Sequence, residues 1–186
     1  MQLNQQGFTL LETLIAMTLS SIVLLGAGRL FPALQGAILL QYQRETLQES
    51  LWQLAFSLGK QLQRAGYCHG TCQGEGLVLG KEGGCVLLQW DGNSNGRWEP
   101  PGHAETERAG FRLSGGNLEV MRGATSCEGA GWEKISDPAM MVIRSFSVTR
   151  QARLSMPPLL IISLAATFKN GQHPVSTRHI VVGYNL

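Results

Sequence analysis

Three residues near the N-terminus, Gly7, Phe8 and Glu12, have types and spacing that could support chemistry. Gly7 is the best small-residue cleavage position in this region, and it precedes an apolar run that begins at Phe8. A secretory signal is cut after its apolar core, so cleavage at Gly7 would leave the apolar segment on the mature chain. The amine freed on Phe8 would lie one helical turn before Glu12, as a cation for its carboxylate on the same or a neighbouring chain.

The apolar run extends from Phe8 to Gly28, and Glu12 is its only charged residue. A helix of about 21 residues spans roughly 31 Å, which is about the thickness of the hydrocarbon core of a bilayer. A charged side chain costs about 2.5–3.5 kcal/mol at the bilayer centre and less near an end, so it marks a functional position. The sequence therefore predicts one membrane-spanning helix with a functional carboxylate near its start.

A second candidate site is the segment 91–99, D-G-N-S-N-G-R-W-E, which matches the first half of an EF-hand-like calcium loop. The side-chain ligands that this pattern predicts are Asp91, Asn93, Asn95 and Glu99. Gly102 stands where such a loop has a bidentate Glu, so calcium would bind weakly. The alternative is a simple turn between strands, because Asp, Asn, Ser and Gly all favour turns.

The same segment contains Gly92-Asn93-Ser94-Asn95-Gly96, which fits the G-x-S-x-G pattern of a hydrolase nucleophile. That pattern requires a helix after the turn, but Pro100 and Pro101 follow. The four histidines have no supporting sequence context, and no acid pair stands out. The chain is therefore predicted not to be an enzyme, and a signal-anchored periplasmic enzyme is the less favoured alternative.

The chain has four cysteines, Cys68, Cys72, Cys85 and Cys127. Their spacing lacks the two close pairs of a structural zinc site, so two disulfides are the favoured interpretation. Four cysteines allow three connectivities. The pairs Cys68–Cys72 and Cys85–Cys127 are preferred, and Cys72–Cys85 is the main rival. Such bonds persist on the non-cytoplasmic side of a membrane.

One long helix is predicted to carry the N-terminal residues and to continue to about Ala65. Pro32 should kink it where it leaves the membrane. Beyond this point leucines recur at helical spacing and form one apolar face, which Trp52 and Phe56 widen. These leucines are Leu47, Leu51, Leu54, Leu58 and Leu62. The second half of the helix is therefore expected to pack on a globular domain.

The remaining sequence predicts strands joined by short turns, and the 23 glycines and seven prolines of the chain fit many turns. Strand signals occur at 77–79, 85–90, 111–113, 117–121, 140–150, 159–168 and 178–184. Ser114-Gly115-Gly116 predicts a hairpin, and Tyr184-Asn185-Leu186 is expected to end an edge strand. The pattern predicts an α+β fold with the helix across an antiparallel sheet. The net charge of +2 does not indicate nucleic-acid binding.

The segment Gly7-Phe8-Thr9-Leu10-Leu11-Glu12 resembles the prepilin processing motif of type IV pilins and type II secretion pseudopilins. In that family a membrane peptidase cuts after the glycine and methylates the new N-terminal phenylalanine, and the glutamate guides filament assembly. The resemblance implies cleavage between Gly7 and Phe8, N-methylation of Phe8 and an assembly role for Glu12. It also implies the type IV pilin-like fold.

Three further segments, 63–70, 89–96 and 122–129, resemble minor pilins similar to the J pseudopilin of type II secretion. The resemblance implies a minor pilin that joins a tip complex and initiates assembly of a type IV pilus. A J-like minor pseudopilin of a type II secretion system is the alternative. The expected partners are other minor pilins, the major pilin, the prepilin peptidase and the inner membrane. No cofactor is expected apart from weakly bound calcium.

The predicted organisation has four parts. Residues 1–7 form a leader peptide, residues 8–30 the transmembrane half of the helix, residues 31–66 its amphipathic half, and residues 67–186 a β-rich periplasmic domain. The protein would be a single-pass inner-membrane protein that reaches the pilus tip after assembly.

Overall fold

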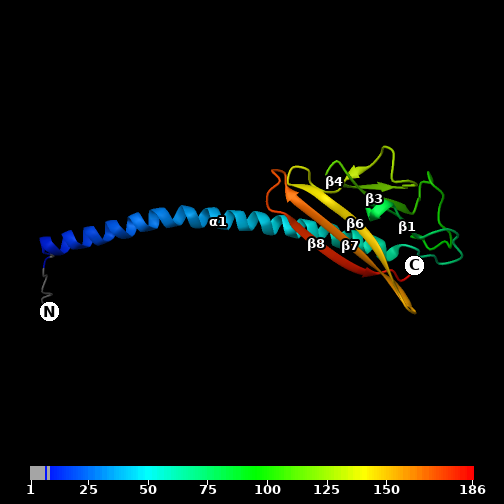
Figure 1. The fold of residues 1–186 in the computed structure, drawn as a ribbon, viewed down its shortest axis with the longest axis horizontal. Coiled ribbons are helices and arrows are strands. Elements are labelled where there is room, and N and C mark those ends of the chain that lie inside the picture. Colours follow the sequence, from blue (N-terminus) through cyan, green and yellow to red (C-terminus); the bar gives the residue numbers. More distant parts are fainter. Residues whose placement is uncertain (1–6, 8) are drawn as a thin grey trace, which may run out of the picture. The chain divides into compact units, whose positions relative to one another are not determined.

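The computed structural model describes Gly7 and residues 9–186, except for the side chain of Lys81. The chain divides into two compact units, Met1–Gln43 and Arg44–Leu186. One helix, α1 (Leu10–Arg64), contributes to both units (Figure 1). Phe8, where the sequence predicts the helix to begin, lies outside the described residues.

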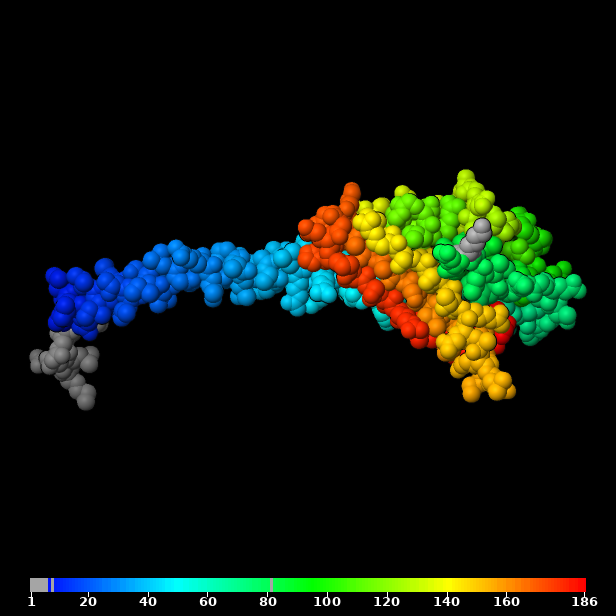
Figure 2. Space-filling model, viewed as in Figure 1, coloured from blue at the N-terminus to red at the C-terminus, as the bar shows by residue number. Residues whose placement is uncertain are grey.

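The first unit consists of the helical residues of α1 up to Gln43. Residues 9–43 are all exposed, and Figure 2 shows them in blue to cyan. Part of α1 reaches a mean hydropathy of 1.9 over 18 residues with none of that window buried, so it is long and apolar enough to cross a membrane. The helix includes Pro32, so this proline does not end it.

The second unit contains two antiparallel sheets. The first has the strand order β1-β2-β3-β4-β5. The second has the order β6-β7-β8, and these three strands lie side by side in Figure 1. The strands are β1 (Leu77–Leu79), β2 (Cys85–Gln89), β3 (Arg108–Ser114), β4 (Asn117–Arg122), β5 (Glu133–Lys134), β6 (Met141–Arg153), β7 (Met156–Phe168) and β8 (Val175–Val182), and a short 3-10 helix, η1, spans Lys81–Gly83. The predicted α+β architecture is confirmed, although the strands form two sheets where one was expected.

The core of the second unit lies between the last turns of α1 and the two sheets. Four of the predicted leucines, Leu47, Leu51, Leu58 and Leu62, are buried there. Leu54 is partly buried and packs against the same core. The four-three spacing of these leucines therefore marks the buried face of the helix correctly.

The prediction that Trp52 and Phe56 widen this buried face is wrong. Trp52 is 48% exposed and Phe56 is 37% exposed. The two rings are one helical turn apart and stack on each other with centroids 5.1 Å apart, and Phe56 meets the edge of the His179 ring. Both rings remain partly exposed, because their positions on the helix are turned away from the leucine face.

The strand prediction also needs three smaller corrections. The short strand β5 was not predicted. Pro157 and Pro158 lie inside β7, where they were expected to precede it. The last strand ends at Val182, so Tyr184-Asn185-Leu186 does not extend an edge strand, and Leu186 packs against the core instead. The Gly115-Gly116 hairpin turn between β3 and β4 has positive φ at both glycines, as such a turn requires.

Two disulfides join the cysteines, and they form the pairs that the sequence analysis preferred. Cys68 is bonded to Cys72, four residues away, just after α1. Cys85, at the start of β2, is bonded to Cys127, which is 42 residues away in the loop after β4. The second bond therefore closes a far larger loop of chain than the first.

Loop size predicts different contributions of these disulfides to stability. Replacing both Cys85 and Cys127 by Ser should lower the free energy of unfolding by about 4 kcal/mol. Replacing both Cys68 and Cys72 by Ser should lower it by about 2 kcal/mol, because a shorter closed loop restricts the unfolded chain less. Urea unfolding of the full chain in detergent micelles, followed by tryptophan fluorescence, measures both losses. A larger loss for the Cys68 and Cys72 pair would contradict this prediction.

Candidate functional site

The N-terminal candidate residues lie at a capped helix start. Helix α1 begins at Leu10, and Thr9 is in the capping position directly before it. The backbone N–H of Glu12 donates to Thr9 Oγ1 at 3.3 Å and to the Thr9 carbonyl oxygen at 3.1 Å. This spacing of Thr and Glu is that of a capping box, in which the acid in the first turn also suits the helix dipole.

Glu12 is thus held in the first turn of α1, exposed and surrounded by exposed apolar side chains such as Leu11 and Leu14. A carboxylate in such a setting needs a positive partner when lipid or another helix covers it. The capping role of Thr9 was missed in the sequence analysis, although the T-x-x-E pattern was there to indicate it. Gly7 is exposed, and the predicted cut and methylation at Phe8 fall outside the described residues.

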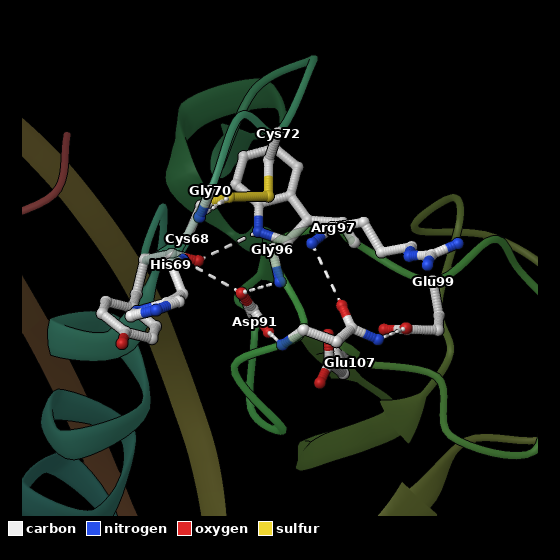
Figure 3. Close-up of a disulfide and its surroundings, with 12 residues drawn as sticks. Cys68, His69, Gly70, Cys72, Asp91, Gly96, Arg97, Glu99 and Glu107 are labelled. Carbon is white, nitrogen blue, oxygen red and sulfur yellow. Dashed lines mark hydrogen bonds between the residues drawn. A yellow bond between two sulfur atoms is a disulfide. The ribbon is translucent and has the colours of Figure 1, made fainter.

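The second candidate site is built around Asp91, which follows β2. Its side chain is 1% exposed and lies at the centre of the loop in Figure 3. Asp91 Oδ2 accepts hydrogen bonds from the backbone N–H of His69 and Gly96, both at 2.9 Å, and Oδ1 accepts one from Asn95 at 3.0 Å. Burial opposes the charged form, but these backbone donors prevail and lower the pKa of Asp91.

Asp91 therefore joins two loops. Its bond to His69 holds the segment of the Cys68–Cys72 disulfide against the loop 91–99 (Figure 3). Trp98 adds a second link, because its Nε1 donates to the Tyr67 carbonyl oxygen at 3.0 Å. A Cβ on Gly70 would lie 2.9 Å from the Gly96 Cα, so the two backbones can approach this closely only with glycine at position 70.

The other predicted calcium ligands bond within the loop. Asn93 Oδ1 accepts the backbone N–H of Asn95 at 3.0 Å, and Asn95 Oδ1 accepts that of Arg97 at 3.1 Å. Asn95 Nδ2 donates to Glu99 Oε1 at 2.5 Å. These bonds are typical of an Asx-rich turn, which was the alternative interpretation. Among the described residues, no group of three or more His, Cys, Asp or Glu side chains is arranged to hold a metal ion.

One residue of this site, Glu107, was not predicted. It lies just before β3 and is 8% exposed. Its Oε1 accepts the backbone N–H of Gly92 at 2.7 Å and of Asn93 at 2.9 Å. The pairing of Gln89 with Arg108 brings Glu107 beside the loop. No local motif connects these positions, so only the strand register could have indicated this residue.

The carboxyls of Glu107 and Glu99 influence each other electrostatically, and Glu99 is 5% exposed. Burial raises the pKa of Glu107, and the Glu99 carboxyl raises it further. The amide of Asn95 and the Glu107 carboxyl lower the pKa of Glu99. The pair therefore combines one ionised carboxylate and one carboxyl that ionises reluctantly.

The G-x-S-x-G segment does not form a nucleophile turn. Ser94 has a φ of 58°, and no helix follows it in residues 95–107, all of which are described. The turn therefore lacks the strand-turn-helix geometry that exposes a hydrolase nucleophile.

Comparison with known proteins identifies relatives of the chain. Residues 40–183 match the family model described as prepilin peptidase-dependent protein B, and residues 2–28 match the prokaryotic N-terminal methylation motif. A protein of Escherichia coli (strain K12) named prepilin peptidase-dependent protein B is 46% identical over 187 residues, which cover 100% of both chains. No solved structure matches the chain significantly.

The role of Asp91 predicts a graded loss of stability. Asp91→Ala should lower the melting temperature more than Asn93→Ala, because it removes the acceptor of three backbone N–H groups where Asn93→Ala removes the acceptor of one. Asp91→Asn, which keeps one side-chain oxygen, should fall between them. Thermal unfolding of the full chain in detergent micelles, followed by circular dichroism, checks this order. An equal or smaller effect of Asp91→Ala would show that the loop does not depend on these bonds.

Proposed function

The chain belongs to the family of prepilin peptidase-dependent protein B, and on this premise we propose that it is a minor pilin that helps to initiate assembly of a type IV pilus. The observation that carries the proposal is the position of Glu12 in the capped first turn of an exposed apolar helix. In this proposal the chain is a structural subunit of the filament. The prepilin peptidase is the enzyme that processes it.

The first step of the proposed role is processing. The N-terminal methylation motif covers Gly7, Phe8 and Glu12. Cutting after Gly7 removes the leader and gives Phe8 a free amine one turn before the Glu12 carboxylate. A cation at this distance offsets the cost of placing the carboxylate among apolar surroundings.

The second step is assembly. Before assembly, the exposed apolar residues of α1 up to Gln43 are covered by the inner membrane, with the domain 44–186 in the periplasm. In the filament, the same side chains pack against the helices of other minor pilins and of the major pilin. A helix that is apolar on all sides suits both environments. The carboxylate of Glu12 then pairs with the N-terminal amine of a neighbouring subunit.

The two-sheet domain selects the neighbours in this proposal. Its core fixes residues 47–62 of α1, so subunits that contact the domain also set the register of the helix. Placement in a tip complex among other minor pilins follows from the initiating role.

Glu12→Val tests this role directly. It should reduce surface pili at least tenfold in cells that carry the matching pilus machinery and lack their own copy of the gene, because the apolar side chain cannot pair with a subunit amine. The level of the processed protein in the membrane should stay unchanged. Quantitative immunoblotting of sheared pili and of membranes measures both.

Two further variants control for charge and for general damage. Glu12→Asp should restore part of the piliation, since it keeps the carboxylate. Glu128→Val changes an exposed glutamate of the globular domain and should leave piliation as in the wild type. Normal piliation with Glu12→Val would refute the assembly role.

A further inference from the structure

Glu99 and Glu107 form a buried pair of acids that the fold does not neutralise. They are 5% and 8% exposed, and the Oε2 atom of each is buried without a hydrogen-bond partner. No basic side chain that the structure describes forms an ion pair with either of them, and Arg112 pairs with Glu119 instead. Figure 3 shows both glutamates beside the loop that Asp91 closes.

Two carboxylates in contact need a positive charge between them. Each carboxylate oxygen accepts hydrogen bonds and donates none, so two ionised groups repel and leave their facing oxygens unsatisfied. Burial makes this repulsion more costly, because buried charges are stable when they are paired or when they bind a metal. Either a shared proton or a bound cation must therefore occupy the space between these groups.

The surroundings favour a metal cation with oxygen ligands. The loop that carries Glu99 follows the D-x-N-x-N-G pattern of calcium sites. The amide of Asn95 contacts Glu99 Oε1, and the amide of Asn93 lies 3.4 Å from Glu105 Oε2. The side-chain oxygens of Asn93 and Asn95 already accept backbone N–H groups, so the neutral ligands would be carbonyl oxygens of the loop and water. The cysteines near this loop, Cys68 and Cys72, are bonded to each other, so they offer no thiolate for a softer metal.

We propose that Glu99 and Glu107 bind a calcium ion, with neutral oxygens of the loop 93–97 and water completing its coordination. This site differs from the one that the sequence predicts. Asp91 closes the loop through backbone N–H groups, and Glu107, from the edge of the neighbouring strand, supplies the second carboxylate. Two charged ligands place the affinity near that of extracellular calcium modules, with a dissociation constant of about 10⁻⁴–10⁻³ M.

Bound calcium would link the middle of the segment between β2 and β3 to the end of that segment. Glu99 lies in the loop after β2, whereas Glu107 directly precedes β3. The ion would therefore stabilise the long connection between these strands and the adjoining Cys68–Cys72 segment.

The test uses the full chain in detergent micelles after treatment with a chelator. Calcium should raise the melting temperature by several degrees with half of the effect near millimolar concentration, and isothermal titration calorimetry should detect one site. Glu107→Gln and Glu99→Gln should each weaken binding at least tenfold, because each removes one of two charged ligands. Glu128→Gln, which changes an exposed glutamate elsewhere in the domain, should bind calcium as the wild type does.

Two results would overturn the proposal. The first is a wild-type chain that neither binds calcium nor gains stability up to 10-fold above the expected dissociation constant. In that case Glu107→Gln should itself raise the melting temperature without calcium, which would identify a shared proton. The second is unchanged calcium binding by Glu107→Gln. Neither result bears on the assembly role, because Glu12 and the processing motif are not part of this site.

Discussion

The protein depends on one physical constraint, which is that no described residue of the first unit covers the apolar surface of its helix. Every residue from Thr9 to Gln43 is exposed, and a large share of them are apolar. An apolar surface of this extent is unfavourable in water, so it must be covered by lipid or by other helices. The single acid, Glu12, is placed in the first turn, where capping by Thr9 and the helix dipole favour it.

In the second unit, by contrast, a short segment of the helix has a stable buried core. Residues 47–62 of α1 bury their leucine face among strands of both sheets. The connections are long and rich in glycine, and they are tied by two disulfides and by the backbone bonds to Asp91. The loop 91–99 is therefore primarily a structural junction, and the strand register brings Glu107 to it.

Sequence patterns predicted the features that depend on local spacing. The long helix, its leucine face, the Gly115-Gly116 hairpin and the processing motif all follow from residues close together in the chain. Features that depend on which strands pair were missed. The division into two sheets and the approach of Glu107 to Glu99 are set by which strands pair, and no local pattern encodes that choice. Trp52 and Phe56 were misplaced because residue type alone does not fix the face of a helix on which a side chain lies.

The central claim, that this chain is a processed filament subunit, is tested most directly by the mass of its mature N-terminus. The protein should be expressed with and without a prepilin peptidase, and its intact mass and N-terminal peptide measured by mass spectrometry. The account predicts loss of Met1–Gly7 and addition of one methyl group to Phe8, both only when the peptidase is present. A chain that keeps its leader beside an active peptidase, or that is cut after the apolar helix, would contradict it.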